Sequence, residues 1–273
     1  MDLEKIEHRA GRGRWLTAYL VLTFGITWGL GSLFIFAPEF VESTFGPAGL
    51  GNPIFILAVY SPAISVLIVV GVTGGRAGLA AFLGRILQWR VGLIWYALVF
   101  LIAPVCTGIG AVFHRVIAGG WPAAPDEGFG SLLAASGFML VLGPLEELGW
   151  RGYMLPVLQR RVAPLTAAII VGIVWGIWHL PSFFVSGLPQ GAWAVFPFLL
   201  AIVCVSVVFT GIFNGSCGSL LLAMLFHWQL NNPFWPDIQP YDAPAFALGA
   251  AAIFALLRRP AFRRESAHTT VFS

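Results

Sequence analysis

Residues 131–158 read SLLAASGFMLVLGPLEELGWRGYMLPVL, and this stretch decides the fold class. A helix that crosses the hydrocarbon core of a bilayer needs about 20 mostly apolar residues, and this stretch is longer than that. Its second half nevertheless carries Glu146, Glu147 and Arg151. Because a charged side chain at the centre of a bilayer costs about 3 kcal/mol, such residues face the inside of a helix bundle rather than lipid. The stretch therefore predicts a membrane-spanning helix that lines a buried polar cavity.

The composition of the 273-residue chain points to the same class. Hydrophobic residues make up 58% of it and charged residues only 10%, whereas a soluble domain carries about 25% charged residues. The mean hydropathy is +0.86. The formal net charge of +3 does not indicate nucleic-acid binding, because the basic residues lie in short loops rather than along one face. We therefore expect an all-α polytopic membrane protein in contact with the lipid bilayer.

Together with residues 131–158, seven further apolar runs predict about eight membrane-spanning helices. The runs cover residues 15–37, 52–73, 92–117, 131–158, 164–185, 192–214, 217–235 and 243–258. Residues 76–90 carry an apolar stripe among arginines and predict a short interfacial helix. The expected organisation is a cytoplasmic N-terminal segment (1–14), a membrane domain (15–258, with its core at about 131–235) and a cytoplasmic tail (259–273). The tail is short and basic, and we expect it to be disordered.

Charged residues sort by side in this topology. If the N-terminus is cytoplasmic, every basic residue except Arg115 falls on the cytoplasmic side. The loops of the opposite side carry Glu39, Glu42, Asp126, Glu127, Asp237 and Asp242. Because lysine and arginine are enriched in cytoplasmic loops, the pattern predicts an even number of spans with both termini in the cytoplasm.

Three predicted spans hold the few polar side chains that can carry chemistry. They are Glu146, Glu147 and Arg151 in the fourth span, Trp175 and His179 in the fifth, and His227 and Asn231 in the seventh. Glu147 and Arg151 are four residues apart, so they share a helical face and can pair. Glu146 points about 100° away from that face and lacks this partner. We interpret Glu147 and Arg151 as structural support and Glu146 as the candidate catalytic carboxylate, while Trp175 packs against His179.

Spacing also predicts that these spans meet in one place. Glu146 and His179 are equally far from the turn at 161–164, so an antiparallel hairpin brings them to the same level. His227 and Asn231 share a helical face, and their level matches if the 151–161 end of the hairpin projects into the cytoplasm. We expect one cavity, reachable from the cytoplasmic side. In it Glu146 and His179 activate water, and His227 and Asn231 donate hydrogen bonds to the oxyanion.

These residues resemble the CAAX-protease and bacteriocin-processing family of intramembrane endopeptidases. The family pattern is a glutamate pair followed by an arginine, an aromatic residue four before a histidine, and a histidine four before an asparagine. Here the pattern is carried by Glu146, Glu147, Arg151, Trp175, His179, His227 and Asn231. The runs 149–153 and 178–181 look like a bacterial branch, and the resemblance covers about 140–232. It implies an endopeptidase of the bacterial inner membrane that cleaves a membrane-associated protein or peptide.

Two questions stay open at this point. Glu146, His179 and His227 have the ligand types of a zinc site with water in the fourth position. The chain lacks a His-Glu-x-x-His helix, so we favour a site without metal or other cofactor and keep zinc as the alternative. The same residues also suit a non-proteolytic immunity or scaffold protein of this fold, or a proton-coupled transporter.

Overall fold

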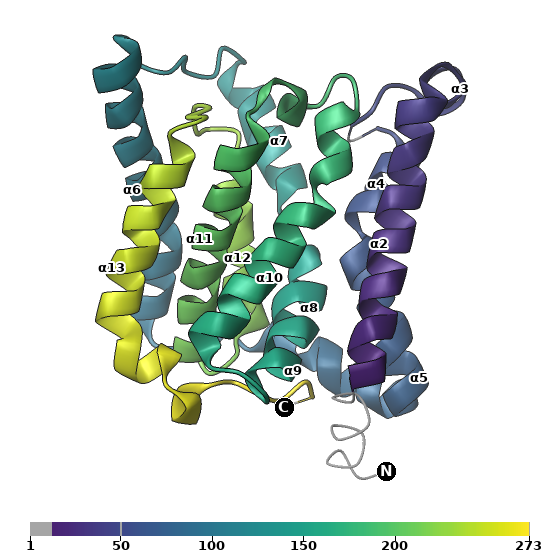
Figure 1. Ribbon diagram of the computed structural model, residues 1–273, viewed down its shortest axis with the longest axis vertical. Coiled ribbons are helices and arrows are strands. Elements are labelled where there is room, and N and C mark those ends of the chain that lie inside the picture. The colour runs from purple at the N-terminus through teal and green to yellow at the C-terminus, as the bar shows by residue number, and fades with distance from the viewer. Residues whose placement is uncertain (1–12, 50, 273) are drawn as a thin grey trace.

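The computed structural model describes residues 13–49 and 51–272, and every regular element among them is a helix (Figure 1). The segments long and apolar enough to cross a membrane are α2 (Gly13–Phe36), α5 with η1 (Ser61–Gly84 and Arg85–Leu87), α6 (Leu93–Ala118), α10 with η3 (Pro164–Trp178 and Leu180–Phe184), α11 (Val195–Gly215) and α13 (Asp242–Phe262). Two shorter apolar helices, α7 (Phe129–Met139) and α12 (Leu220–Leu230), lie where the fourth and seventh spans are predicted. The predicted all-α polytopic membrane fold is confirmed. Residues 1–12 of the predicted N-terminal segment lie outside the described residues.

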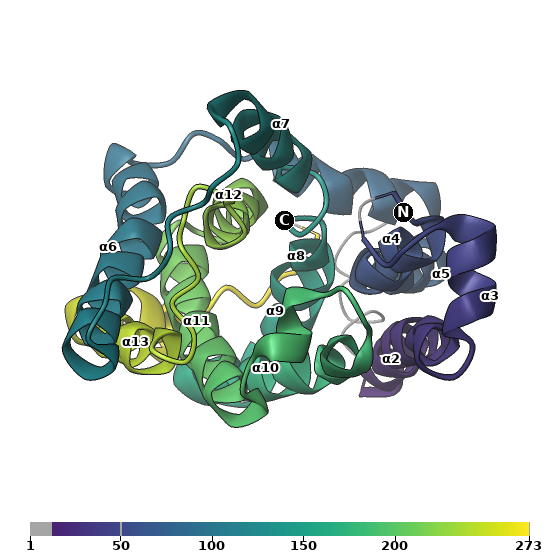
Figure 2. The same cartoon turned by 90° about the horizontal axis from the view of Figure 1, so that it is seen from above.

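The remaining helices are short and lie at the ends of the bundle, directly before α5 or inside the fourth span. They are α3 (Pro38–Phe45), α4 (Pro53–Val59), α8 (Glu146–Gly149), the π-helix η2 (Trp150–Met154), α9 (Leu155–Gln159), η4 (Pro189–Ala192) and η5 (Arg264–Ser266). Seen from above, α8, α10, α11 and α12 lie around the middle of the bundle (Figure 2).

The predicted single helix over 131–158 is wrong in detail, because the span is broken. Residues 140–145 form turns in which the Glu146 amide donates to the Gly143 carbonyl and the Glu147 amide donates to the Pro144 carbonyl. Proline lacks an amide hydrogen and cannot sit in a continuous helix without loss of a hydrogen bond. A π-helical turn follows at Trp150–Met154, a feature that is frequent at functional sites.

The arginine-rich segment 76–90 forms a short helix after a break in the chain, in agreement with part of its prediction. Residues 76–84 belong to α5, which is kinked at Gly75 by a φ of 59° that glycine adopts readily. Arg85 is buried rather than placed at the lipid headgroups. Its Nη1 donates to the Gly152 carbonyl at 2.9 Å, so this cation holds the kinked end of α5 against the fourth span.

Close packing of α11 against α10 positions the helix that carries His179. Gly172 lies so near α11 that a Cβ there would be 2.7 Å from the Cα of Val203. In the same contact, Ser206 Oγ donates to the Ala168 carbonyl at 2.8 Å. On the other side of α11 lies α13. At the start of α12, the Ser219 hydroxyl accepts a hydrogen bond from the Leu222 amide, and such caps fix where a helix begins.

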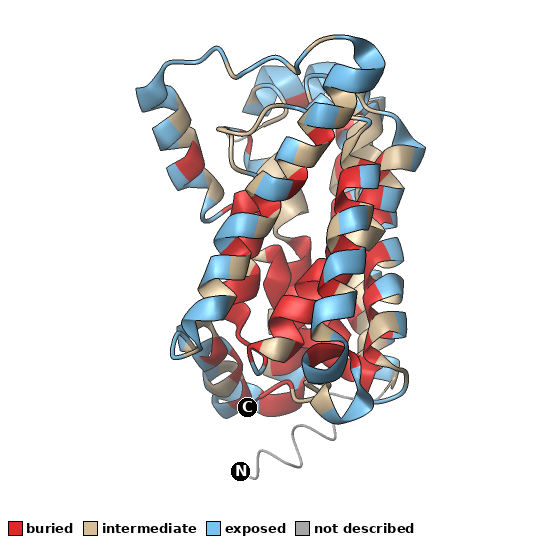
Figure 3. Cartoon of the chain, turned by 90° about the vertical axis from the view of Figure 1, so that its left-hand side faces the viewer, coloured by how far each residue is buried: buried red, intermediate tan, exposed pale blue. Residues whose placement is uncertain are grey.

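The C-terminal segment is ordered, and the expectation of a disordered tail is wrong for residues 263–272. Val271 and Phe272 are buried in the main core. Arg85 Nη1 donates to the Val271 carbonyl at 3.0 Å, and Gln159 Nε2 donates to the His268 carbonyl at 2.8 Å. The segment therefore closes the end of the bundle where Gly13 also lies (Figure 1). Buried residues concentrate in that half of the molecule (Figure 3). Residues 151–157 are also buried. They therefore do not project from the bundle, in contrast to the prediction.

Removing the buried ring of the tail is expected to destabilise the protein. Phe272→Ala should lose about 3 kcal/mol, the typical lower cost of truncating a core phenylalanine. For a chain of this size that corresponds to a fall in Tm of roughly 6 °C or more. Thermal denaturation of the detergent-solubilised protein measures it, with Phe36→Ala as control because Phe36 is 84% exposed. Equal Tm values for both variants would show that the tail does not stabilise the fold.

Candidate active site

A cavity of about 930 Å³ occupies the central space of the bundle. The four predicted catalytic residues, Glu146, His179, His227 and Asn231, all line it, and so does Trp175. They come from α8, the end of α10 and the end of α12. The structure thus brings together the polar side chains of three helices that are distant in sequence, while their roles stay predictions.

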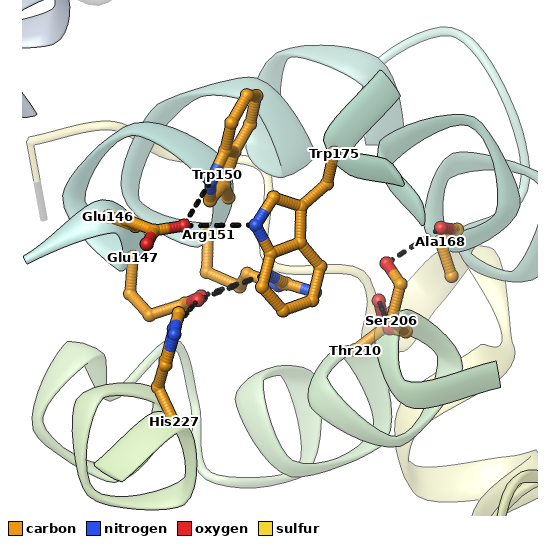
Figure 4. A network of polar contacts seen from close by, with 9 residues as sticks. All are labelled: Glu146, Glu147, Trp150, Arg151, Ala168, Trp175, Ser206, Thr210 and His227. Carbon is orange, nitrogen blue, oxygen red and sulfur yellow. Dashed lines mark hydrogen bonds and ion pairs between the residues drawn. The ribbon is translucent and has the colours of Figure 1, made fainter. Parts of the chain in front are cut away.

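Glu146 lies at the first position of α8, directly after the break in the fourth span. Its side chain is buried, and its Oε2 accepts hydrogen bonds from Trp175 Nε1 at 3.0 Å and from Trp150 Nε1 at 3.4 Å (Figure 4). The two indoles hold one carboxylate oxygen in a fixed place. Trp150 was not predicted as a site residue. Its position four residues after Glu146, on the same helical face, could have indicated the contact.

Glu147 points to a different set of partners, as the helical spacing predicts. Arg151 Nη1 donates to Glu147 Oε1 at 3.1 Å, so the predicted ion pair is present. His227 Nδ1 lies 2.7 Å from the same oxygen, and this contact was not predicted. All three side chains are almost completely buried (Figure 4). The guanidinium also stacks over the ring of Phe209, whose centroid is 3.9 Å away, an arrangement that favours a cation.

His179 ends α10 and is held among aromatic rings. Its Nδ1 lies 2.8 Å from the Trp175 carbonyl. Because a carbonyl only accepts, Nδ1 carries the hydrogen, and in the neutral ring Nε2 keeps a lone pair. Trp178 packs edge-on at 4.7 Å between ring centroids, and Trp175 lies 5.6 Å away, as predicted. The Trp175 ring is also 5.5 Å from His227, so this indole packs against both imidazoles.

Gly143 is a site residue that the sequence reasoning missed. It lines the cavity directly beside Asn231 and His227. A Cβ at this position would lie 2.9 Å from His227 Nε2 and closer still to Asn231 Nδ2. Only glycine leaves room for both side chains to reach the cavity here. Its place directly before Pro144, three residues ahead of Glu146, was the signal that could have indicated it.

Gly143→Ala is therefore expected to lower catalytic activity with little loss of fold. The added methyl group must displace His227 or Asn231, and a displacement of about 1 Å in an active site costs on the order of 100-fold. We expect kcat/KM to fall about 100-fold on a cleavable peptide. Gly137→Ala is the matched control, because a Cβ at Gly137 meets nothing within 4 Å. Full activity in Gly143→Ala would contradict this placement.

The cavity opens at the end of the bundle opposite to the tail. Its outer lining comes from loop residues that include Gly49, Asp126, Gln190 and Asp237. We predicted access from the cytoplasmic side, where the predicted topology places the arginine-rich end, but the cavity lining does not reach that end. At that end the buried residues of η2 and α9, together with the tail, close the bundle.

The alternative zinc ligands do not come together as a ligand set. Within residues 13–49 and 51–272, no three His, Cys, Asp or Glu side chains are grouped so that they could hold a metal ion. Glu146, His179 and His227 are thus not placed as a three-ligand set among the described residues.

Comparison with known proteins places the same segment in a known family. A family model described as type II CAAX prenyl endopeptidase, Rce1-like, matches residues 128–232. CAAX prenyl protease 2 of Methanococcus maripaludis is 34% identical over 99 residues, which are 34% of this chain and 36% of that protein. The matched segment contains the broken fourth span and all four predicted catalytic residues. Residues 128–232 are therefore similar to type II CAAX prenyl endopeptidases, and the match spans about a third of the length of the curated relative.

Proposed function

We propose that this protein is a CAAX-type intramembrane endopeptidase that hydrolyses a peptide bond of a membrane-associated protein or peptide. The observation that carries the proposal is the meeting of Glu146, His179, His227 and Asn231 in one cavity within the family-matched segment. The membrane-protein class and the family support the coarse assignment.

Glu146 is the proposed general base. Two indole N–H groups fix its Oε2, which leaves Oε1 to accept the proton of a water in the cavity. His179 presents the lone pair of Nε2 and orients the same water. The hydroxide adds to the carbonyl carbon of the scissile bond, and Glu146 then passes the proton to the departing nitrogen as the carbon–nitrogen bond breaks. Such proton transfer contributes about 10²–10⁴-fold to a rate.

His227 and Asn231 are the proposed oxyanion donors. The Asn231 amide carries two N–H groups, and a protonated His227 carries N–H on both ring nitrogens. With Nδ1 bonded to Glu147, the Nε2–H of this imidazolium points to the cavity, beside Gly143. The Glu147 carboxylate balances the positive charge, and Arg151 holds Glu147 in place. Glu147 is therefore a positioning residue that acts through His227.

The proposal is tested with purified, reconstituted protein and a panel of membrane-anchored peptides. Wild type should cleave at least one peptide, and Glu146→Ala and His179→Ala should not. His114→Ala is the matched control, because His114 lies outside the cavity. A folded wild type that cleaves nothing in a broad panel would refute the enzyme and favour the scaffold or transporter alternatives. Stoichiometric zinc, lost together with activity on chelation, would overturn the metal-free mechanism.

The charge of the cavity predicts a preference among peptides. Its lining includes Asp126, Glu127, Asp237 and Asp242 and, within the described part of the chain, no lysine or arginine. A cleft lined by one sign of charge raises the association rate of the opposite sign by about 10-fold or more at low salt. Lysine-flanked peptides should therefore show higher kcat/KM than matched aspartate-flanked ones, and the difference should shrink at high salt because salt screens it. Equal rates at low salt would refute this preference.

A further inference from the structure

The two ends of the helix bundle carry opposite charge. The end that contains the start of α2 and the tail carries Arg14, Arg76, Arg85, Arg90, Arg160, Arg161, Arg258, Arg259, Arg263 and Arg264. Among the described residues of that end, Glu265 is the acidic one. The other end carries Glu39, Glu42, Asp126, Glu127, Asp237 and Asp242, with Arg115 as its basic residue among those described. We call these the arginine end and the acidic end.

This charge distribution orients the protein in its membrane. Arginine and lysine in short loops beside membrane helices are retained on the cytoplasmic side. All the loops at the arginine end are short, such as residues 160–163 between α9 and α10 and residues 216–219 between α11 and α12. The arginine end thus belongs in the cytoplasm, and the acidic end belongs outside it.

The cavity communicates with the acidic end alone among the described surfaces. Its lining takes no residue from 13–26, 60–102, 147–174, 206–226 or 247–272, the segments that build the arginine end. Instead it takes residues of the loops at the acidic end, namely 48–49, 123–127, 187–190 and 232–239. Above the site, Trp193 Nε1 donates to Asp237 Oδ2 at 2.8 Å and ties two of these loops together.

We propose that the active-site cavity opens to the extracytoplasmic face, so that the substrate presents its scissile segment there. The substrate class is a membrane-anchored protein or peptide whose cleavable segment has been exported. The presence of a substrate rests on the proposed function. The direction in which the cavity opens does not depend on catalytic activity. A protein with this opening would not trim chain termini in the cytoplasm, because those termini would meet the closed arginine end of the bundle.

Cysteine labelling in spheroplasts tests the direction of the opening. The native Cys217 is exposed at the arginine end and reports on the cytoplasmic side. The other two cysteines, Cys106 and Cys204, are replaced by alanine in every variant. For the opposite side, Ala124→Cys and Glu127→Cys are each placed in a chain that also carries Cys217→Gly. An impermeant maleimide should label positions 124 and 127 in intact spheroplasts and Cys217 only after lysis. Labelling of Cys217 but not of positions 124 and 127 in intact spheroplasts would overturn the inference.

A second measurement separates this inference from the enzyme assignment. A peptide cleaved by the purified protein is given an acyl anchor and added outside intact spheroplasts that contain the full chain. We expect wild type to cleave it and Glu146→Ala to leave it intact. Cleavage only after lysis would overturn the inference while the enzyme stands. Labelling from outside, with no peptide cleaved by the purified protein, would refute the enzyme and leave the direction of the cavity intact.

Discussion

Glu146→Gln is expected to abolish peptide hydrolysis while the protein stays folded. Glutamine keeps the shape of glutamate and a carbonyl oxygen that can accept from the indoles of Trp150 and Trp175. It cannot accept a proton from water near neutral pH, so the general-base contribution is lost. We expect kcat to fall by about 10²–10⁴-fold. The measurement is single-turnover cleavage of the best peptide found for the wild type.

Two controls make this result specific to position 146. Glu42→Gln changes a carboxylate at the acidic end, outside the cavity, and should leave kcat unchanged. Thermal denaturation should give similar Tm values for Glu146→Gln and wild type. If Glu146→Gln keeps kcat within tenfold of wild type, Glu146 is not the base and the proposed mechanism is wrong.

Arg151→Leu is expected to have the largest effect on stability. The guanidinium is completely buried and lies 3.1 Å from Glu147. Removing it leaves the buried Glu147 carboxylate with His227 as its remaining partner. Loss of one partner of a buried ion pair costs about 3 kcal/mol at the lower end of the range, which applies here because His227 still faces the carboxylate. For a chain of this size, Tm should fall by roughly 6 °C or more.

A double substitution distinguishes loss of the ion pair from simple loss of packing. Glu147→Leu together with Arg151→Leu removes both charges, and replacement of a buried pair by apolar groups is often near neutral. The double variant should recover most of the lost Tm but not the activity, because His227 then lacks its partner. Arg258→Leu, at an exposed arginine, is the matched control. No recovery in the double variant would show that the charge of Glu147 is not the cause.

The helices were predictable because their signal is local. Apolar length alone marked the spans, and for α6 the predicted 92–117 agrees closely with Leu93–Ala118. Spacing also predicted that Glu147 pairs with Arg151 while Glu146 points elsewhere. Breaks within a span were harder to predict. Gly143 and Pro144 lie in a continuous apolar run, so a count of apolar residues predicted one helix where a turn separates α7 from α8. The tail was misjudged on its charge, although its last residues, Val271 and Phe272, are apolar and buried.

By itself the sequence determined the membrane class, the helical spans, the charge sorting of the loops and the few polar residues available for chemistry. Only the tertiary structure decided that His227 contacts Glu147, that Gly143 makes room for Asn231, and that the cavity opens at the acidic end. Periodicity along a helix reports which face is apolar, but it holds no information on which other helix covers that face. Those contacts join residues 80 or more positions apart, and they depend on how all the helices pack at once.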